Sequence, residues 1–316
     1  METCHLAIAW CWEYDADFIS HVDQECCGRG IRSYLIHSDN LSESLRRIQD
    51  GELRFRIFFD RASDQQEAFD KLVQVIQHQR ARMINDADRL KLAIDKAAMQ
   101  KRLSSEGIDV PQTFVLPPWY RRLRIESLPT ESLGIPFVVK PATGGCGDGV
   151  VKDARSVQDV QKARQMFPRD RYLLQERIEP TQIGVRRAWF RVFFAFGEVL
   201  PCWWDDQTKK ADALSPLDVD DKTYSGITAI MRKTARICKL ELFSTEIALT
   251  PKGELLVIDP VNDQVDLRKK SSHMDGVPDQ VVDRIALNLV GWVEKLVKRR
   301  LKHNQVLGAG SCAANC

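Results

Sequence analysis

The sequence has no apolar run that approaches the roughly 20 residues of a membrane-spanning helix. Its first residues lack the basic-then-apolar order of a signal peptide. Net charge is also small, because 46 Lys and Arg residues stand against 44 Asp and Glu residues, which leaves +2. A nucleic-acid partner normally requires a clear basic excess, so this class is disfavoured. We therefore expect a cytoplasmic globular protein without a membrane or nucleic-acid partner, and a homodimer is compatible with this profile.

Cysteine and glycine motifs of several common classes are absent as well. None of the nine cysteines forms a C-x-x-C pair, which argues against a zinc ribbon or a thioredoxin-like motif. Most stand in apolar surroundings, so reduced, buried thiols are the favoured interpretation. Residues 11–15, which follow the first expected strand, contain no G-x-G-x-x-G fingerprint, and this disfavours a dinucleotide site there.

The first 80 residues alternate between strand-like and helix-like patterns. The expected strands are 5–10, 31–36 and 53–59, and the expected helices are 16–27, 41–48 and 63–79. This β-α-β-α-β-α order predicts a small parallel sheet with helices on its faces, and therefore an α/β fold class.

The rest of the chain is predicted to start with one long helix over residues 85–106. Strands are expected at 113–116, 136–140, 150–151, 172–175, 189–196, 198–204, 241–249 and 254–259, and helices at 156–166, 224–238 and 279–301. The polar stretch 205–222 has no period and is interpreted as a long loop. Two basic stretches, 80–102 and 294–302, are interpreted as solvated helix faces, with tRNA or a peptide tail as the alternative partner.

A glycine loop follows a buried strand that ends in a lysine. The strand Phe137-Val-Val-Lys140 leads into four glycines within nine residues, Gly144, Gly145, Gly147 and Gly149. Glycines let backbone N–H groups approach an anion closely, and the lysine adds a point charge. The G-K-[ST] order of a P-loop is missing. A flexible hairpin beside a lysine is the structural alternative.

Carboxylates stand in a predicted hairpin near residue 250. Its turn, Thr250-Pro-Lys-Gly253, has the proline and glycine positions of a type I turn. Folding at this turn brings Glu246 close to opposite Asp259, with Asn262 shortly after. Two carboxylates and an amide oxygen form a set suited to Mg²⁺, whereas a solvated strand edge explains each acid taken alone.

In order and spacing, these elements resemble the ATP-grasp superfamily, in particular its glutathione-synthetase-like and D-alanine:D-alanine-ligase-like branches. The resemblance covers about residues 1–300 and includes Ile94-Asp-Lys96, the strand and loop from Phe137, Leu173-Leu-Gln-Glu176, Phe190-Arg191-Val and the acidic hairpin. It implies an α/β fold with an α+β lid and an N-terminal Rossmann-like domain. The implied parts are an N-terminal domain 1–84, a connecting helix and start of the ATP-grasp region 85–133, a lid subdomain 134–180, a catalytic subdomain 181–303 and a flexible tail 304–316.

The resemblance also assigns roles to residues. Lys96 and Lys140 would contact ATP phosphates, and Arg191 would hold the transferred phosphate or an acyl-phosphate, which makes Lys140 and Arg191 the catalytic candidates. The glycine loop would close over the phosphates. Adenine would meet the strand end at Gln175, Glu176 and Ile178, mostly through main chain. One or two Mg²⁺ ions, with Mn²⁺ as a substitute, would bind Glu246, Asp259 and Asn262.

Four features depart from the family pattern. The last metal motif, Asp259-Pro-Val-Asn262, is one residue longer than the usual Glu-x-Asn, so Asp263 or Asp266 is an alternative ligand. Glu179 and Gln182 are weak candidates for a ribose contact. Trp203 and Trp204 stand where a basic residue is common, and packing is favoured over substrate stacking for this pair. Arg186 and Arg187 are candidates for a substrate carboxylate or for a solvated strand end.

The implied activity is an ATP- and Mg²⁺-dependent, ADP-forming ligase. It would join a small-molecule carboxylate to an amine, from an amino acid or peptide, or to a thiol, through an acyl-phosphate intermediate. The alternatives are a nucleotide-binding scaffold without turnover and a small-molecule kinase on the same fold. The tail with Cys312 and Cys316 is expected to be disordered, and a thiol-carrying role is the alternative.

Overall fold

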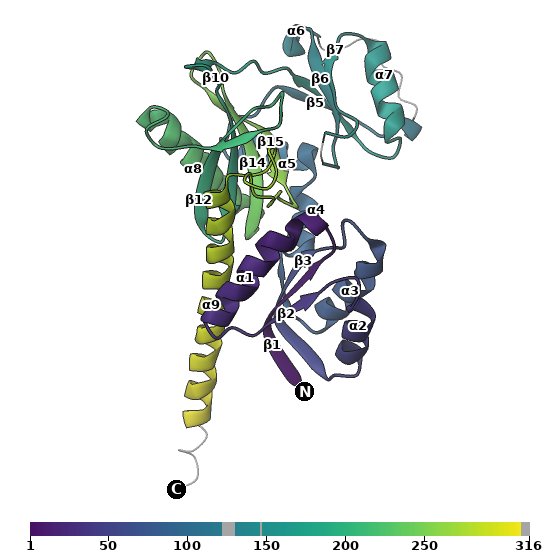
Figure 1. Cartoon of the computed structure of the whole chain (residues 1–316). Helices are drawn as coiled ribbons and strands as arrows, with labels where there is room; N and C mark the ends of the chain where they lie inside the picture. Colours follow the sequence, from purple (N-terminus) through teal and green to yellow (C-terminus); the bar gives the residue numbers. More distant parts are fainter. Residues whose placement is uncertain (122–129, 146, 311–316) are drawn as a thin grey trace. The chain divides into compact units, whose positions relative to one another are not determined.

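The computed structural model describes residues 1–121, 130–145 and 147–310, with the backbone alone at 130–131 and 300–310. The chain divides into two compact units (Figure 1). The first unit contains Met1–Ala87, Ala195–Glu198 and Asp266–Cys316, and the second contains Asp88–Phe194 and Val199–Val265. The sequence grouped 266–303 with the catalytic subdomain instead, and the five-part division stays a prediction. Within the described residues, no helix is both long and apolar enough to cross a membrane.

The first unit is built on a parallel sheet with the strand order β2-β1-β3-β4. Its strands are β1 (Glu2–Trp10), β2 (Ser33–Ile36), β3 (Leu53–Arg61) and β4 (Arg82–Ile84). The predicted three-stranded parallel sheet is therefore confirmed. The fourth strand was not predicted, because three residues are too few to show an alternating pattern.

Helices cover both faces of this sheet. They are α1 (Ala16–Gly28), α2 (Leu41–Gln49) and α3 (Asp70–His78), with short 3₁₀ turns at Glu13–Asp15 and Glu67–Phe69. Right-handed connections place α1 on one face and α2 and α3 on the other (Figure 1). The predicted helix 63–79 is wrong in its first half, because the Asp60 carboxylate accepts hydrogen bonds from the backbone N–H groups of Ala62 and Ser63 and holds a turn.

The C-terminal helix α9 (Asp279–Gly310) packs along α1 within the same unit (Figure 1). Its buried stripe has the helical spacing predicted from the sequence, at Val282, Ile285, Leu289 and Val293. The predicted start at residue 279 is confirmed. Residues 304–310 of the tail that was expected to be disordered are helical, and Cys312 and Cys316 lie outside the described residues.

A buried ion pair stands at the carboxyl end of this parallel sheet. Arg61, at the end of β3, donates from Nε and Nη2 to the two carboxylate oxygens of Asp15, with both distances 2.7 Å. Side-chain exposure is 3% for Arg61 and 1% for Asp15. Such a bidentate pair uses the fork of the guanidinium fully. It fixes the turn after β1 to the end of β3.

The second unit contains a four-stranded antiparallel sheet with the order β5-β8-β6-β7. Its elements are β5 (Thr113–Leu116), α6 (Thr130–Leu133), β6 (Phe137–Pro141), β7 (Val151–Ala154), α7 (Val157–Met166) and β8 (Tyr172–Glu176). Ser156 caps α7, and Asp159 completes the capping box, so a local signal fixes this helix start. Phe137, Val139 and Tyr172 form a core with α7.

A five-stranded sheet with the order β13-β12-β11-β14-β15 forms the rest of the second unit. Its elements are β11 (Trp189–Ala195), β12 (Glu198–Trp204), β13 (Ala211–Ala213), α8 (Asp221–Cys238), β14 (Leu242–Leu249) and β15 (Leu255–Asn262), and a small ribbon is made by β9 (Gln182–Ile183) and β10 (Arg186–Arg187). The predicted loop 205–222 is wrong in part. β13 pairs with β12 inside it, and Asp220 caps α8 at residue 221.

The long helix predicted over residues 85–106 is also wrong. Two helices occupy it, α4 (Ala87–Ala93) and α5 (Lys96–Ser105). Asp95 separates them, because its side chain accepts from the backbone N–H of Ala98 and caps α5. This break makes Lys96 the first residue of α5.

Candidate active site

Lys140 lies near the end of β6 and is almost completely buried, with 6% exposure. Its Nζ donates to the carbonyl oxygen of Ile258 at 2.9 Å. Burial, the largest cause, lowers the pKa of the Lys140 ammonium; Asp259 opposes the shift and Lys96 adds to it. An ammonium group held in so little water interacts strongly with any anion brought beside it.

Lys96 reaches the same place from the start of α5. Its Nζ donates to the carbonyl oxygen of Gly144 at 2.6 Å and lies 3.8 Å from Oδ1 of Asp259. The structure therefore brings Lys96, the first glycine of the loop and Asp259 together, and the phosphate contact of Lys96 stays a prediction.

The glycine loop has the backbone that its composition predicts. Gly144, Gly147 and Gly149 have φ values of +95°, +84° and +71°, which other residues rarely adopt. A Cβ added at Gly149 would lie 2.7 Å from the Phe167 ring, so space as well as backbone conformation requires glycine there. Cys146, in the middle of this loop, lies outside the described residues.

The two predicted carboxylates pair across the hairpin, as expected. Glu246 on β14 is the register partner of Asp259 on β15, and the backbone N–H of Gly253 donates to the Thr250 carbonyl at 2.9 Å to close the turn. Burial raises the pKa of the Asp259 carboxyl, and the ammonium groups of Lys96 and Lys140 oppose the shift. The carboxylate charge of Asp259 therefore has a free-energy cost in the absence of a further cation.

The extra residue of the metal motif is absorbed by an irregular register. Ser244 pairs with Asn262 and Glu246 with Asp259, so β15 uses three steps where β14 uses two. A β-bulge of this kind restores the alternation, and Asn262 then shares a face with Asp259 despite the odd spacing. Pro260, which has no N–H to give to the ladder, stands inside the bulge.

A second register shift in the hairpin, between Glu246 and Ile247, leaves Ile258 outside the pairing of β14 and β15. Ile247 pairs with Val257 directly beside the pair of Glu246 and Asp259, so Ile258 has no register partner on β14. The Ile258 carbonyl is the group that accepts from Lys140. The irregular register of β15 thus places the Lys140 ammonium beside Asp259.

Asp259 and Asn262 each have one side-chain atom that makes no hydrogen bond with the described residues. Oδ1 of Asp259 and Nδ2 of Asn262 are buried and have no hydrogen-bond partner among the described residues. In the same ranges, no group of three or more His, Cys, Asp and Glu side chains is arranged to hold a metal ion. The set here has two carboxylates and one amide, whose oxygens suit Mg²⁺. Asp266, the alternative ligand, belongs to the first unit and is bound by Arg268.

Arg191 lies on β11 beside the carboxylates. Its Nη2 donates to Oε1 of Glu246 at 2.5 Å, and the indole N–H of Trp189 donates to Oε2 at 3.2 Å. The Trp204 ring lies over the guanidinium, with Cζ 3.6 Å from the ring centroid. Trp189 was not singled out from the sequence, although its position two residues before Arg191 places it on the same face of the strand.

The predicted adenine segment lies at the end of β8. Gln175 is 2% exposed and its amide donates to the Thr113 hydroxyl at 3.0 Å. The Glu176 carboxylate accepts from the backbone N–H of Gln112 at 2.9 Å. Both side chains are therefore used inside the protein, which is compatible with main-chain recognition of a base there. That role, and the role of Ile178, stay predictions.

The candidate acceptor-side arginines already have acidic partners. Arg186 pairs with Asp212 at 2.7 Å, and Arg187 pairs with Asp206 at 2.8 Å and with Glu179 at 3.2 Å. Their binding of a substrate carboxylate stays a prediction, as do the ribose contacts of Glu179 and Gln182. A substrate that bound these arginines would have to compete with partners supplied by the segment 205–222.

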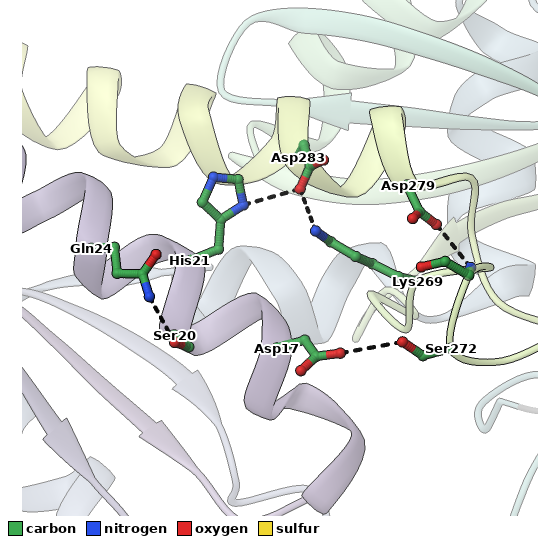
Figure 2. Close-up of a pocket in the computed structure, with 9 residues that line it drawn as sticks. Asp17, Ser20, His21, Gln24, Lys269, Ser272, Asp279 and Asp283 are labelled. Carbon is green, nitrogen blue, oxygen red and sulfur yellow. Dashed lines mark hydrogen bonds and ion pairs between the residues drawn. The ribbon is translucent and has the colours of Figure 1, made fainter.

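The first unit contains an open polar cavity of about 500 Å³. Figure 2 shows Asp283 at its wall, with Oδ1 3.0 Å from Nδ1 of His21 and 2.6 Å from Lys269 Nζ, which are ion-pair distances. Asp17 accepts from the Ser272 hydroxyl at 3.4 Å on the other side. None of the site residues predicted from the sequence lines this cavity.

No protein-family model matches the chain, and no curated protein matches its sequence. Solved structures do match over nearly the whole chain. D-alanine–D-alanine ligase from Bacillus anthracis, complexed with ATP, gives a TM-score of 0.66 at 10% identity, covering 93% of this chain and 98% of that one.

Two further structures give a similar result. The ATP-grasp ligase PsnB, complexed with a minimal precursor, Mg and ADP, gives a TM-score of 0.61 at 12% identity, with 92% and 98% of the two chains covered. A RimK domain ATP-grasp protein from Sphaerobacter thermophilus gives 0.59 at 18% identity, with 91% and 99% covered. The chain therefore has the α/β ATP-grasp fold, as its motifs indicated, at identities that establish the fold alone.

Proposed function

We propose that this protein is an ATP- and Mg²⁺-dependent, ADP-forming ligase that joins a small-molecule or peptide carboxylate to an amine or a thiol. The observation that carries the proposal is the convergence of Lys96, Lys140 and Asp259 in the second unit. Three cationic side chains and two carboxylates meet there, counting Arg191 and Glu246. The fold supports it, since similar proteins were solved with ATP or with Mg and ADP.

The chain's own groups account for the chemistry of phosphoryl transfer, in which positioning and charge neutralisation dominate. Lys96 and Lys140 would bind phosphate oxygens, and the glycine loop would cover them and exclude water. Asp259, Asn262 and Glu246 are the residues that would hold Mg²⁺, which supplies charge neutralisation on the phosphates when bound. Oδ1 of Asp259, which accepts no hydrogen bond from any described residue, fits this assignment.

Arg191 would bind the phosphoryl group during its transfer to the substrate carboxylate. The bond between the γ-phosphorus and the bridging oxygen breaks, the carboxylate oxygen bonds to phosphorus, and ADP leaves. The amine or thiol then attacks the acyl carbon, phosphate leaves with the bonding electrons, and the nucleophile loses a proton. Guanidinium and ammonium groups stabilise the charge on phosphorus oxygens throughout.

ADP release in the presence of a panel of amino acids and short peptides tests the proposal. Wild type is compared with Lys140→Ala and Asp259→Ala, and with Lys162→Ala, an exposed lysine on α7, as the matched control. We expect Mg²⁺-dependent ADP release that is lost in the first two variants and kept in the control. Replacement of Mg²⁺ by Mn²⁺ tests the substitute metal.

Different results select the alternatives. A stable phosphorylated product, seen by mass spectrometry in place of an amide or thioester, would identify a kinase. Nucleotide binding without ADP release over the whole panel would identify a scaffold. Nucleotide binding that is independent of Mg²⁺ and unaffected by Lys140→Ala would overturn the assignment of this site.

A further inference from the structure

One face of the five-stranded sheet carries a continuous row of interacting side chains. The row runs across neighbouring strands, from Trp204 on β12 through Arg191 on β11 and Glu246 on β14 to Asp259 on β15. Each member touches or faces the next. The side chain of Arg191 is therefore held by groups on both neighbouring strands, the Glu246 carboxylate on β14 and the Trp204 ring on β12.

The contact between Trp204 and Arg191 is close. The guanidinium carbon lies 3.6 Å from the ring centroid, a separation at which the two planes must stack face to face, whereas the other cation–aromatic contacts of the described residues range from 4.6 to 5.9 Å. Trp204 is buried, with 9% exposure, so its ring cannot leave this position without repacking. The stack fixes the plane of the guanidinium.

The nitrogen atoms of Arg191 differ in whether they are hydrogen-bonded. Nη2 is bound to Glu246, whereas Nε is buried and has no hydrogen-bond partner among the described residues. Leaving a buried donor unpaired costs free energy, and a site that binds an anion can recover that cost when the anion arrives. When the plane of the guanidinium is fixed, the Nε–H bond points in a defined direction.

We infer that Trp204 is a positioning residue, which holds the Arg191 guanidinium so that its unpaired N–H donates to an oxygen of the phosphoryl group being transferred. The inference rests on the proposed function and adds to it the reason for a tryptophan at a position where the family commonly has a basic residue. Trp204 itself touches neither nucleotide nor substrate. Its effect is transmitted through the orientation of Arg191.

The neighbouring tryptophan provides a matched control. Trp203 is similarly buried, with 6% exposure, but it points to the opposite face of β12, where it packs against Phe190 with ring centroids 5.1 Å apart. Its indole N–H donates to Asp218 at 3.2 Å. Trp203→Phe therefore tests the exchange of a buried indole for a smaller ring on this strand without touching Arg191, and is matched to Trp204→Phe.

The test measures the affinities of full-length protein for Mg²⁺·ADP and for Mg²⁺ with a non-hydrolysable ATP analogue, by titration calorimetry. The variants are Trp204→Leu, Trp204→Phe, Trp203→Phe, Arg191→Lys and the double variant Trp204→Leu/Arg191→Lys. We expect Trp204→Leu to lower the preference for the triphosphate about tenfold, from the loss of one desolvated cation–π contact. Trp204→Phe should keep most of the preference, and Trp203→Phe all of it.

Non-additivity identifies the route of the effect. Arg191→Lys keeps the charge but not the planar fork, and the double variant should be no worse than the more affected single variant. ADP release should show a raised KM for ATP, in line with the calorimetry, together with a lower kcat, because Arg191 would contact the phosphoryl group before and during its transfer. If Trp204→Leu does not fold, judged by thermal unfolding, Trp204→Met replaces it as an unbranched side chain without an aromatic face.

Two results overturn the inference alone. The first is a Trp204→Leu variant that keeps the wild-type preference for the triphosphate, and the second is a double variant in which the two losses simply add. A wild-type protein that binds neither nucleotide would instead remove the proposed function, and the inference with it.

Discussion

Two ion clusters of this protein, one buried and one partly buried, differ in whether their charged groups are fully hydrogen-bonded. In the first unit, Arg61 donates two hydrogen bonds of 2.7 Å to the Asp15 carboxylate, and at most 3% of either side chain is exposed. In the second unit, Lys96 Nζ is 3.8 Å from Oδ1 of Asp259, and that oxygen accepts no hydrogen bond from any residue that the structure describes.

The comparison indicates how a structural ion pair differs from a binding site. A closed bidentate pair satisfies itself and stabilises the fold only when both partners are present. A cluster with unpaired atoms and a carboxyl whose pKa is raised by burial carries a cost that a cation and an anionic ligand can remove. The second arrangement is typical of functional sites.

The largest expected effect concerns Asp259. Asp259→Asn should lower Mg²⁺-dependent ADP release by roughly a thousandfold, because a metal ligand and its charge are lost. The free energy of unfolding of the ligand-free protein should not fall, since the charge is unfavourable in the folded state. Steady-state kinetics and urea unfolding measure the two quantities. Asp221→Asn, at an exposed position in α8, is the control, and a large loss of stability in Asp259→Asn would contradict the comparison.

The closed pair should show the opposite balance. Asp15→Asn should lower the free energy of unfolding by about 3 kcal/mol, because it leaves the buried Arg61 without its counter-charge. Asp50→Asn, in the pair with Arg46 where both side chains are about half exposed, should cost less than about 1 kcal/mol. Urea unfolding of both variants decides the matter. Equal losses in the two would show that burial of the pair has no energetic importance.

A pH series separates the Asp259 contribution from the rest. Because the pKa of Asp259 is raised in the folded state, the folded protein binds this proton more tightly than the unfolded chain does. The stability that the group contributes is therefore present below the ordinary carboxyl pKa and is lost as pH rises through the raised value. The unfolding free energy of wild type minus that of Asp259→Asn should decrease over this acid window and then become constant. A difference that increases with pH would reverse the sign and refute the assignment.

The smallest effects concern thiols, for which the two units should behave alike. Burial raises the pKa of the Cys26 thiol to about 12 and that of Cys238 to about 11, one in each unit. Both should stay protonated at pH 8 and react with iodoacetamide at least tenfold more slowly than the exposed Cys27. Peptide mass spectrometry after timed labelling measures the rates. Fast labelling of Cys238 alone would show that reagents reach the core of the second unit near this thiol, and the two units would then differ.

Local patterns were sufficient for many elements. The strands 113–116 and 198–204 have the predicted bounds, since each shows an uninterrupted alternating or apolar pattern. The pairing of Glu246 with Asp259 also followed from the sequence, because a short turn of known type fixes the register of the strands that it joins. These are cases in which the decisive interactions lie within a few residues of one another.

Other features depended on competition or on distant partners. The break at Asp95 was missed because helical periodicity continues through it, while a capping carboxylate decides the local conformation. The strand β13 was missed because three residues in a polar segment become a strand only when β12 is beside them. The bulges of β15 were likewise not visible, since an odd spacing alone does not say which residue leaves the ladder.

The sequence by itself determined the set of chemically capable residues and the local elements that carry them, because composition, turns and periodicity act over short distances. Only the tertiary structure decided which groups share a place: that Lys96 meets Gly144, that the Ile258 carbonyl is free for Lys140, and that Trp204 stacks on Arg191. The physical reason is that the order of strands in a sheet is set by non-local hydrogen bonds and packing. Residues far apart in the sequence become neighbours only after that order is established.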